Sequence, residues 1–242
     1  MMAVSLPLLG HLSPRALALV AMLAILIVAV PIVAALTARR FARPAVAAAS
    51  KIGRYLRTIA VLWLVTALAI YALRLYGQRP SDVGVRAPHA PIELLAGLVV
   101  AAALLLLSAG RSEIGPDYAR RIRVVVPAST IEWALFVGLA ATAGMCEEFL
   151  YRGYALVKVA QLLGSLSAGV VISSVAFGLA HSYQGRMGMI GASVAGFLYA
   201  LVFLATGSLL PCMIGHFAQD IGGALLLARR LPPVPQPTTS SL

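Results

Sequence analysis

Charged side chains are scarce in this sequence, and their scarcity excludes most classes of soluble protein. Asp, Glu, Lys and Arg make up 11% of the 242 residues, hydrophobic residues make up 61%, and the mean hydropathy is +0.94. A typical soluble domain contains about 25% charged residues. No alternation of apolar and polar residues marks a β-strand, so a transmembrane barrel is not expected either. The composition predicts a protein embedded in a lipid bilayer.

Cysteine is also rare. The sequence has two, Cys146 and Cys212, and both lie in apolar segments. We expect each to be a buried, inert thiol rather than half of a disulfide or a ligand.

Long apolar runs occupy most of the chain. A run of roughly 20 apolar residues can cross the hydrocarbon core as a helix. The first run is expected to remain as a helix and not to be a signal peptide, since it is about 20 residues long and is followed by Arg39, Arg40 and Arg43. The predicted fold class is therefore all-α, a polytopic membrane protein with a bundle of about six to eight transmembrane helices. The runs cover about residues 15–36, 58–76, 92–110, 129–146, 167–182, 189–206 and 208–228.

Positive charge is concentrated at the ends of these runs. The net charge is +11, and the arginines cluster in 37–57, 111–123 and the pair Arg229–Arg230. This is the positive-inside pattern, so we expect the three segments to be cytoplasmic and no nucleic acid to be bound. Arginine far outnumbers lysine, and alanine and leucine are abundant, which suggests a bacterial source. The expected location is the bacterial cell membrane, as a multi-pass protein.

The two halves of the chain differ in character. Residues 1–123 are interpreted as an N-terminal three-helix module, with the polar, proline-containing stretch 77–91 as an external connector. Residues 124–230 form the second, functional region. Residues 231–242, rich in Pro, Ser and Thr, are predicted to be a disordered tail. The halves show no internal repeat, which argues against a repeat-built transporter.

Ionisable side chains enter the apolar runs in the second half. Each costs about 2.5 kcal/mol or more near the bilayer centre, so several together must face one another or an aqueous cavity. Glu132 and Lys158 lie near predicted helix ends and are expected to reach for the interface without a functional role. The residues in question are Glu132, Glu147, Glu148, Arg152, Lys158, His181, His216 and Asp220.

The two adjacent glutamates are expected to have different roles. Glu148 and Arg152 are one helical turn apart, so the guanidinium can neutralise that carboxylate. Glu147 points about 100° around the helix and cannot share Arg152 equally. The spacing therefore predicts one structural carboxylate and one free carboxylate.

Together with His181 and the pair His216 and Asp220, the free carboxylate suits hydrolysis of an acyl bond such as a peptide. Direct attack by water is expected, because the serines lack the turn that exposes a nucleophilic hydroxyl. Zinc held by Glu147, His181 and His216 is an alternative, although no His-x-x-x-His pair is present.

Three ordered motifs resemble a known family. They are Glu147-Glu148-x-x-x-Arg152, Phe177-x-x-x-His181 and His216-x-x-x-Asp220, set in EEFLYRGY, SSVAFGLAH and ATGSLLPCMIGH. Over about residues 125–228 the chain resembles the CPBP family, which contains the CAAX prenyl proteases and bacteriocin-processing enzymes. The resemblance implies an all-helical intramembrane endopeptidase. Its substrate stays open among a prenylated C-terminus, a leader peptide and a transmembrane segment, and for a bacterial source we expect a peptide or membrane-protein substrate.

The resemblance also implies the role of each residue. Glu147, assisted by His181, would activate the water; His216 and Asp220 would hold the oxyanion; Glu148 and Arg152 would support the site. Asp220 stands where the family has Asn or Asp, and an ionised Asp cannot donate to an oxyanion. Asp220 must therefore either be protonated or act by orienting a charged His216. We expect no cofactor: Asp220 can orient His216, whereas no acceptor near His181 is evident to orient it as a zinc ligand.

Two alternatives stay open at this stage. The chain could be a non-catalytic immunity or scaffold protein, or a small proton-coupled transporter using Glu and His. A geometric difficulty also exists, because threading the apolar runs in order places Glu147 and His181 toward opposite membrane faces. A long or tilted helix around 129–162 would resolve it.

Overall fold

The computed structural model describes residues 13–41, 51–110 and 114–231, and within these ranges all regular structure is helical. The proposed disordered tail lies outside the described residues, apart from Leu231. Among the described residues, six helices are long and apolar enough to cross a membrane, and Leu166–Ala180 is a shorter apolar helix. These observations confirm an all-α, polytopic membrane bundle.

The first half contributes three long apolar helical segments. The first is a continuous rod in which a π-helical stretch joins two α-helices, and the second is α4. A polar connector with two 3-10 turns leads to α5, and the short α6 follows. The bounds are α1 Pro14–Ala24, η1 Ile25–Ala29, α2 Val30–Phe41, α4 Lys51–Leu75, η2 Pro80–Val83, η3 Pro91–Glu93, α5 Leu94–Ala109 and α6 Pro116–Ile122.

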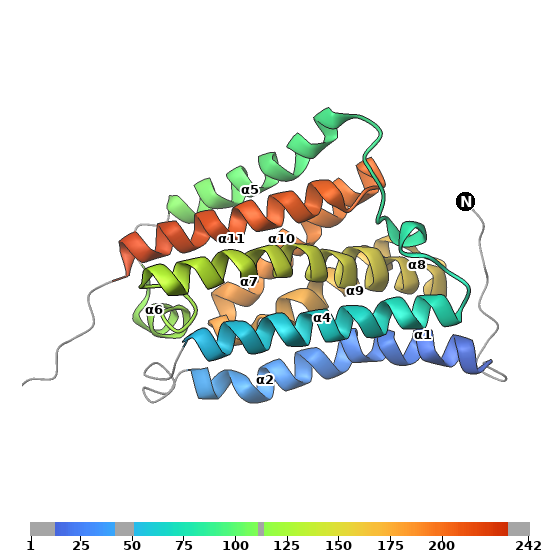
Figure 1. The fold of residues 1–242 in the computed structure, drawn as a ribbon, viewed down its shortest axis with the longest axis horizontal. Helices are drawn as coiled ribbons and strands as arrows, with labels where there is room; N and C mark the ends of the chain where they lie inside the picture. The colour runs from blue at the N-terminus through green and yellow to red at the C-terminus, as the bar shows by residue number, and fades with distance from the viewer. Residues whose placement is uncertain (1–12, 42–50, 111–113, 232–242) are drawn as a thin grey trace, which may run out of the picture.

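One uninterrupted helix of 34 residues, Thr130–Leu163, runs through the centre of the bundle (Figure 1). It comprises α7 (Thr130–Glu148), the π-helical η4 (Phe149–Leu156) and α8 (Val157–Leu163). Hydropathy alone placed its end near residue 146. The helix continues because the charged residues that follow are buried against partners within the bundle. The long helix anticipated around 129–162 is thus present.

A tight hairpin brings the next helix back alongside this one. The turn is at Gly164, whose φ of +62° lies in the left-handed region that glycine adopts without strain. It leads into α9 (Leu166–Ala180). Glu147 and His181 lie equally far from Gly164 along the chain, 17 residues before it and 17 after it. The two arms of the hairpin therefore bring both residues to about the same level of the bundle, which resolves the threading difficulty.

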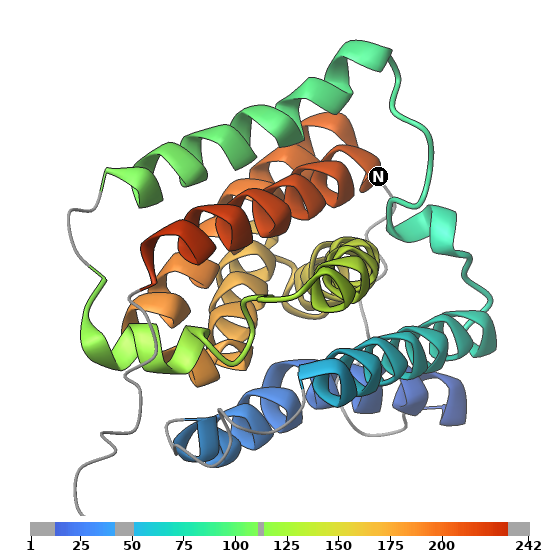
Figure 2. The ribbon, with the colours of Figure 1, turned by 60° about the vertical axis from the view of Figure 1, so that its left-hand side comes forward.

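Two further helices complete the bundle. The 3-10 turn η5 (Ser182–Gln184) leads into α10 (Gly185–Thr206), and α11 (Leu210–Arg230) follows after a glycine turn. Figures 1 and 2 show α7 flanked by α4 on one side and by α11 on the other, with α5 beyond α11 (Figure 2).

Close backbone contact explains why α5 packs on α11 and away from α4. A Cβ atom on Gly97 would lie 1.7 Å from the Pro211 carbonyl oxygen, and one on Gly215 would lie 2.3 Å from the Gly97 oxygen. Small residues let membrane helices approach this closely. The helices of residues 1–123 are consequently divided, with α1, α2 and α4 on one side of the bundle and α5 on the other.

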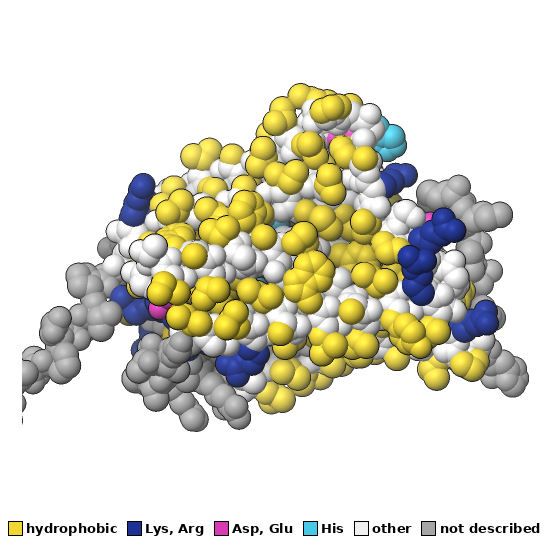
Figure 3. All heavy atoms as spheres, viewed as in Figure 1, with side chains coloured by type: hydrophobic (Ala, Val, Ile, Leu, Met, Phe, Trp, Pro, Cys, Tyr) yellow, Lys and Arg dark blue, Asp and Glu magenta, His cyan; other side chains and the backbone are white. Residues whose placement is uncertain are grey.

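The described residues of the three basic segments meet at one end of the bundle, at the left in Figure 1. Arg121 on α6 donates to the carbonyl of Ala38 at the end of α2, 3.2 Å away. Lys51 at the start of α4 donates to the carbonyl of Val126. Arg230 at the end of α11 donates to the last carbonyls of α5. In the space-filling view, Lys and Arg lie toward the two ends and hydrophobic side chains cover the surface between them (Figure 3).

The connector 77–91 closes the opposite end. Val83 is 1% exposed, and its carbonyl oxygen would lie 2.8 Å from a Cβ on Gly153. The backbone N–H of Leu209 donates to Gly84, and Arg86 donates to the carbonyl of Gly207. The connector is therefore packed into the helix ends.

Candidate active site

Three helices bring the predicted residues together midway along the bundle. Glu147 and Glu148 lie near the middle of the 34-residue helix, His181 caps the end of α9, and His216 and Asp220 lie in successive turns of α11. Ion-pair distances between titratable side chains of different helices confirm that they converge.

Glu147 lies between the two histidines. Its Oε2 is 3.9 Å from Nε2 of His181 and 3.9 Å from Nε2 of His216. This oxygen is buried and has no hydrogen-bond partner among the described residues. A water oxygen can lie about 2.8 Å from two polar atoms separated by 3.9 Å. The geometry therefore suits a water held between the carboxylate and an imidazole.

Glu148 and Arg152 form the predicted ion pair. Arg152 Nη1 lies 2.9 Å from Glu148 Oε1, and the two side chains are 1% and 0% exposed. The guanidinium also lies over the ring of Phe177, 4.4 Å from its centroid, as in a cation–π contact. Gly196 lies beside it, and a Cβ there would lie 3.4 Å from Arg152 Nη2.

Each histidine is oriented through its Nδ1 atom. His181 Nδ1 lies 2.8 Å from the Phe177 carbonyl oxygen, and His216 Nδ1 lies 2.7 Å from Glu148 Oε1. Since these oxygens accept, each Nδ1 donates, and each Nε2 is directed toward Glu147.

Two expectations about these acceptors were wrong. His181 does have a local acceptor, a backbone carbonyl that the pattern of side chains could not reveal. Asp220 is not the acceptor for His216: its Oδ1 lies 3.8 Å from Nε2, beyond hydrogen-bond distance, and Glu148 occupies that role.

The site borders a large cavity of about 1060 Å³. Glu147, His181 and His216 line its inner part, whereas Asp117, Arg121 and Arg230 line it at the basic end. Leucines, valines and methionines of α4, α5 and α10 make up much of the wall. The cavity therefore connects the site with the end of the bundle where the basic segments meet.

Charged side chains of α6 pair with one another at the mouth of the cavity. Asp117 accepts hydrogen bonds from Arg120 and Arg121 on the same short helix. The hydrogen bond from Arg121 holds the pKa of the Asp117 carboxyl below its usual value. The α6 segment, expected only as part of a basic loop, is thus a short helix beside the cavity.

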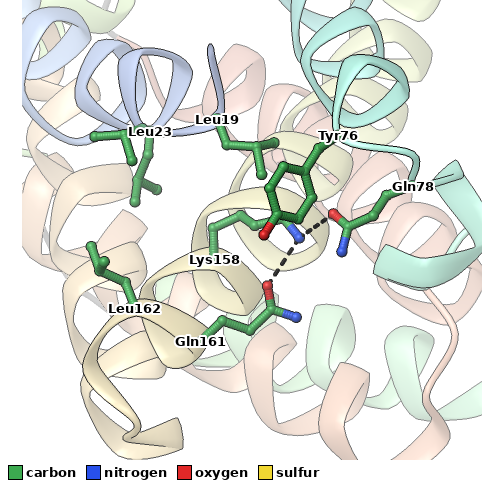
Figure 4. Close-up of a pocket in the computed structure, with 8 residues that line it drawn as sticks. Leu19, Leu23, Tyr76, Gln78, Lys158, Gln161 and Leu162 are labelled. Atoms are coloured by element: carbon green, nitrogen blue, oxygen red, sulfur yellow. Dashed lines mark hydrogen bonds between the residues drawn. The ribbon is translucent and has the colours of Figure 1, made fainter. Parts of the chain in front are cut away.

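Lys158 does not behave as predicted. It was expected to extend toward the interface, but it is 6% exposed and turned inward. Its ammonium donates to the amide oxygens of Gln78, 2.5 Å away, and Gln161, 3.0 Å away. Figure 4 shows these contacts in a small pocket near Tyr76 (Figure 4). This pocket shares no lining residue with the large cavity. Lys158 therefore fastens the connector to α8. Glu132 likewise has a partner, Lys51, at 3.2 Å.

Sequence reasoning did not single out Tyr199 and Gln219. The ring of Tyr199 is stacked on that of His216, with centroids 6.0 Å apart and planes 11° from parallel. Its hydroxyl donates to Oε1 of Gln219, 2.9 Å away. The sequence does contain one indication for Gln219, because it lies three residues after His216 and therefore on the same helix face. Both cysteines are buried free thiols, as expected.

Glu147, His181 and His216 are side chains of the types that bind zinc, but their donor atoms lie too far apart to share one zinc ion. Two imidazole nitrogens and a carboxylate oxygen are a common zinc donor set, and an acceptor orients each histidine. Ligands about 2.0–2.2 Å from zinc lie roughly 3.4 Å apart in a tetrahedron, closer than the 3.9 Å separations here. In the described part of the chain, no three His, Cys, Asp or Glu side chains are grouped closely enough to hold an ion.

Comparison with known proteins finds a family model that matches part of the chain. Residues 129–222 match the family model described as type II CAAX prenyl endopeptidase Rce1-like. No curated protein and no solved structure matches the chain. The matched region begins at the 34-residue helix and ends just after Asp220, so it contains every residue of the three motifs. Over these residues the chain is therefore similar to the CAAX-type endopeptidases, which supports an intramembrane protease.

Proposed function

We propose that the protein hydrolyses a peptide bond of a membrane-associated substrate with a water activated by Glu147. The observation that supports this most directly is the position of Glu147 Oε2, buried and 3.9 Å from both histidine Nε2 atoms. A carboxylate oxygen without a hydrogen-bond partner among the described residues, such as Glu147 Oε2, can accept a proton. Glu148, in contrast, is already engaged by Arg152 and His216.

In this proposal, Glu147 takes a proton from water as the oxygen attacks the scissile carbonyl carbon. His181, held by the Phe177 carbonyl, orients that water through Nε2. The proton on Glu147 then passes to the leaving amine as the carbon–nitrogen bond breaks. Every atom of the water is accounted for in the two products.

His216 is proposed to stabilise the oxyanion. The carboxylates of Glu148 and Asp220 on either side of its ring attract positive charge, so His216 is suited to donate from Nε2. Asp220 acts through His216 in this scheme, as an electrostatic partner 3.8 Å away.

A zinc-dependent version of the same activity uses Glu147, His181 and His216 as ligands. The specific observation in its favour is that both Nε2 atoms are directed at the same carboxylate oxygen. The metal would supply Lewis-acid activation of water or carbonyl. We favour the metal-free mechanism, because it leaves Glu147 available as the base. Full turnover after phenanthroline treatment, with far less than one zinc per chain, is expected; activity lost with the metal and restored by its return would overturn this choice.

The cavity suggests the direction of substrate entry. It reaches the end of the bundle where the basic segments lie, which the positive-inside rule assigns to the cytoplasm. Its apolar wall suits an extended peptide or the end of a membrane-protein segment. We infer that cleavage takes place on the cytoplasmic side of a bacterial cell membrane.

The non-catalytic alternatives are less well supported. A scaffold or immunity protein has no need to retain Glu147, His181, His216 and Asp220 around one cavity. A transporter of the repeat type has discontinuous helices at its binding site, whereas the long helix through this site is continuous.

The test is cleavage of a library of membrane peptides by purified protein in detergent. Wild type and Glu147→Gln should be compared, with Glu93→Gln as the matched control, since Glu93 lies outside the cavity lining. We expect cleavage by wild type and by the control only. Equal cleavage by Glu147→Gln would refute the proposed role.

A further inference from the structure

Gln219 has a defined place beside the reacting groups. It lies on α11 three residues after His216 and one before Asp220, so all three share a face of that helix. Gln219, His216 and Glu147 line the same cavity. Its side chain therefore faces the space in which a substrate carbonyl would lie.

The orientation of the Gln219 amide is set by Tyr199. The Tyr199 hydroxyl donates to Oε1 of Gln219 at 2.9 Å. Tyr199 is itself 1% exposed and stacked on the His216 ring, so its hydroxyl has little freedom. Because the oxygen and nitrogen of a primary amide occupy opposite branches of one plane, holding Oε1 also fixes Nε2. The two N–H groups of Nε2 are thereby presented as donors from a supported side chain.

The proposed reaction needs such a donor. When water adds to the carbonyl carbon, the carbonyl electron pair becomes a negative charge on oxygen, which neutral or positive donors stabilise. An ionised Asp220 offers only acceptors and would repel this charge. The neighbouring amide of Gln219 is neutral and can donate.

We propose that Gln219 donates a hydrogen bond from Nε2 to the oxyanion, alongside His216, and that Tyr199 is a positioning residue for that amide. This inference rests on the proposed peptide hydrolysis. In the step concerned, a water O–H bond breaks and its proton goes to Glu147. A carbon–oxygen bond forms, and the displaced carbonyl pair is held by Gln219 until the carbon–nitrogen bond breaks.

The experiment compares Gln219→Glu, Gln219→Met and Tyr199→Phe in the peptide assay. Glu matches the size of Gln but is an acceptor, and Met matches its length without a donor. We expect each Gln219 variant to lower kcat by about 10²–10³-fold with KM changed little, as for removal of one oxyanion donor. Tyr199→Phe should have a smaller effect, and adding it to Gln219→Met should cost nothing further, because Tyr199 acts through the amide.

A binding measurement separates a catalytic from a structural role. A peptide phosphinate mimics the tetrahedral intermediate, whereas the uncleaved peptide amide mimics the ground state. Binding of the phosphinate to Gln219→Glu and Gln219→Met should weaken in proportion to kcat, with binding of the amide unchanged. Either variant suffices if the other fails to fold.

Three results would overturn the inference. Gln219→Met with kcat within threefold of wild type, where Glu147→Gln is inactive, would refute the role of Gln219 alone. Equal weakening of phosphinate and amide binding would assign Gln219 to substrate binding only. Equal cleavage by wild type and Glu147→Gln would instead remove the proposed hydrolysis mechanism, and the role of Gln219 with it.

Discussion

The 34-residue helix and α4 lie side by side, yet they tolerate charge very differently. The spanning window of α4 is 22% buried within the protein and has a mean hydropathy of 2.0, whereas that of the central helix is 50% buried with a value of 1.3. Most of α4 faces lipid, where an ionised group has no partner. The central helix is surrounded by other helices that supply partners for Glu147, Glu148 and Arg152. A position inside the bundle, more than local hydropathy, determines where charge can be placed.

The largest effect should come from the free carboxylate of the central helix. Glu147→Gln removes the proposed base and should reduce kcat by about 10²–10⁴-fold. Its melting temperature should stay close to that of wild type, because Glu147 Oε2 has no hydrogen-bond partner among the described residues to lose. Kinetics and thermal unfolding on one preparation test this. A large loss of stability would place Glu147 among the structural residues.

The next largest effect concerns the buried pair. Arg152→Met leaves Glu148 without its guanidinium and should lower the free energy of unfolding by about 3–5 kcal/mol, with loss of folded yield. The matched change on the lipid-facing helix, Arg74→Met, should have almost no effect because Arg74 is exposed at the end of α4. Unfolding in detergent measures both. Equal stability of Arg152→Met and wild type would contradict the structural role.

A smaller loss is expected at the far end of the central helix. Lys158→Met keeps the length of the side chain but leaves the amide oxygens of Gln78 and Gln161 without their donor. The expected cost is about 1–3 kcal/mol. Peptide cleavage at a temperature well below unfolding should be unchanged, since Lys158 lies outside the cavity. Reduced kcat in the fully folded variant would show that this end of the helix is coupled to the site.

The smallest effect is expected outside both helices, at the mouth of the cavity. Because the pKa of Asp117 is lowered by Arg121, its pairing stabilises the folded protein above the unfolded pKa and is lost as pH falls through the folded pKa. Asp117 is 59% exposed, so the contribution should stay below about 1 kcal/mol and decrease with salt. Melting temperatures of wild type and Asp117→Asn, measured against pH, should differ slightly at neutral pH and converge in acid. A difference in melting temperature that increases as the pH falls would contradict this prediction.

Much of the bundle could be predicted from residue types and spacing. Every apolar run corresponds to a helix, and the spacing of Glu148 and Arg152 gave their ion pair. The length of the central helix could not be taken from hydropathy, because its charged second half is stabilised by neighbours that are distant in the sequence. The orientation of His181 was also hidden, since its acceptor is the backbone carbonyl of Phe177. The contact between His216 and Glu148 depends on how α11 crosses α7, which no local pattern encodes.

The connector 77–91 has a consequence for the membrane itself. A hydrolase needs water within the bilayer thickness, and a continuous water path would also conduct protons and dissipate the transmembrane potential. Here the cavity lining reaches the basic end, while Val83 and Leu209 are buried at 1% and 0% exposure at the other end, where the connector is bonded to the turn before α11. In the proposed mechanism, this arrangement would supply water to Glu147 from one compartment and would keep the electrical insulation between the two.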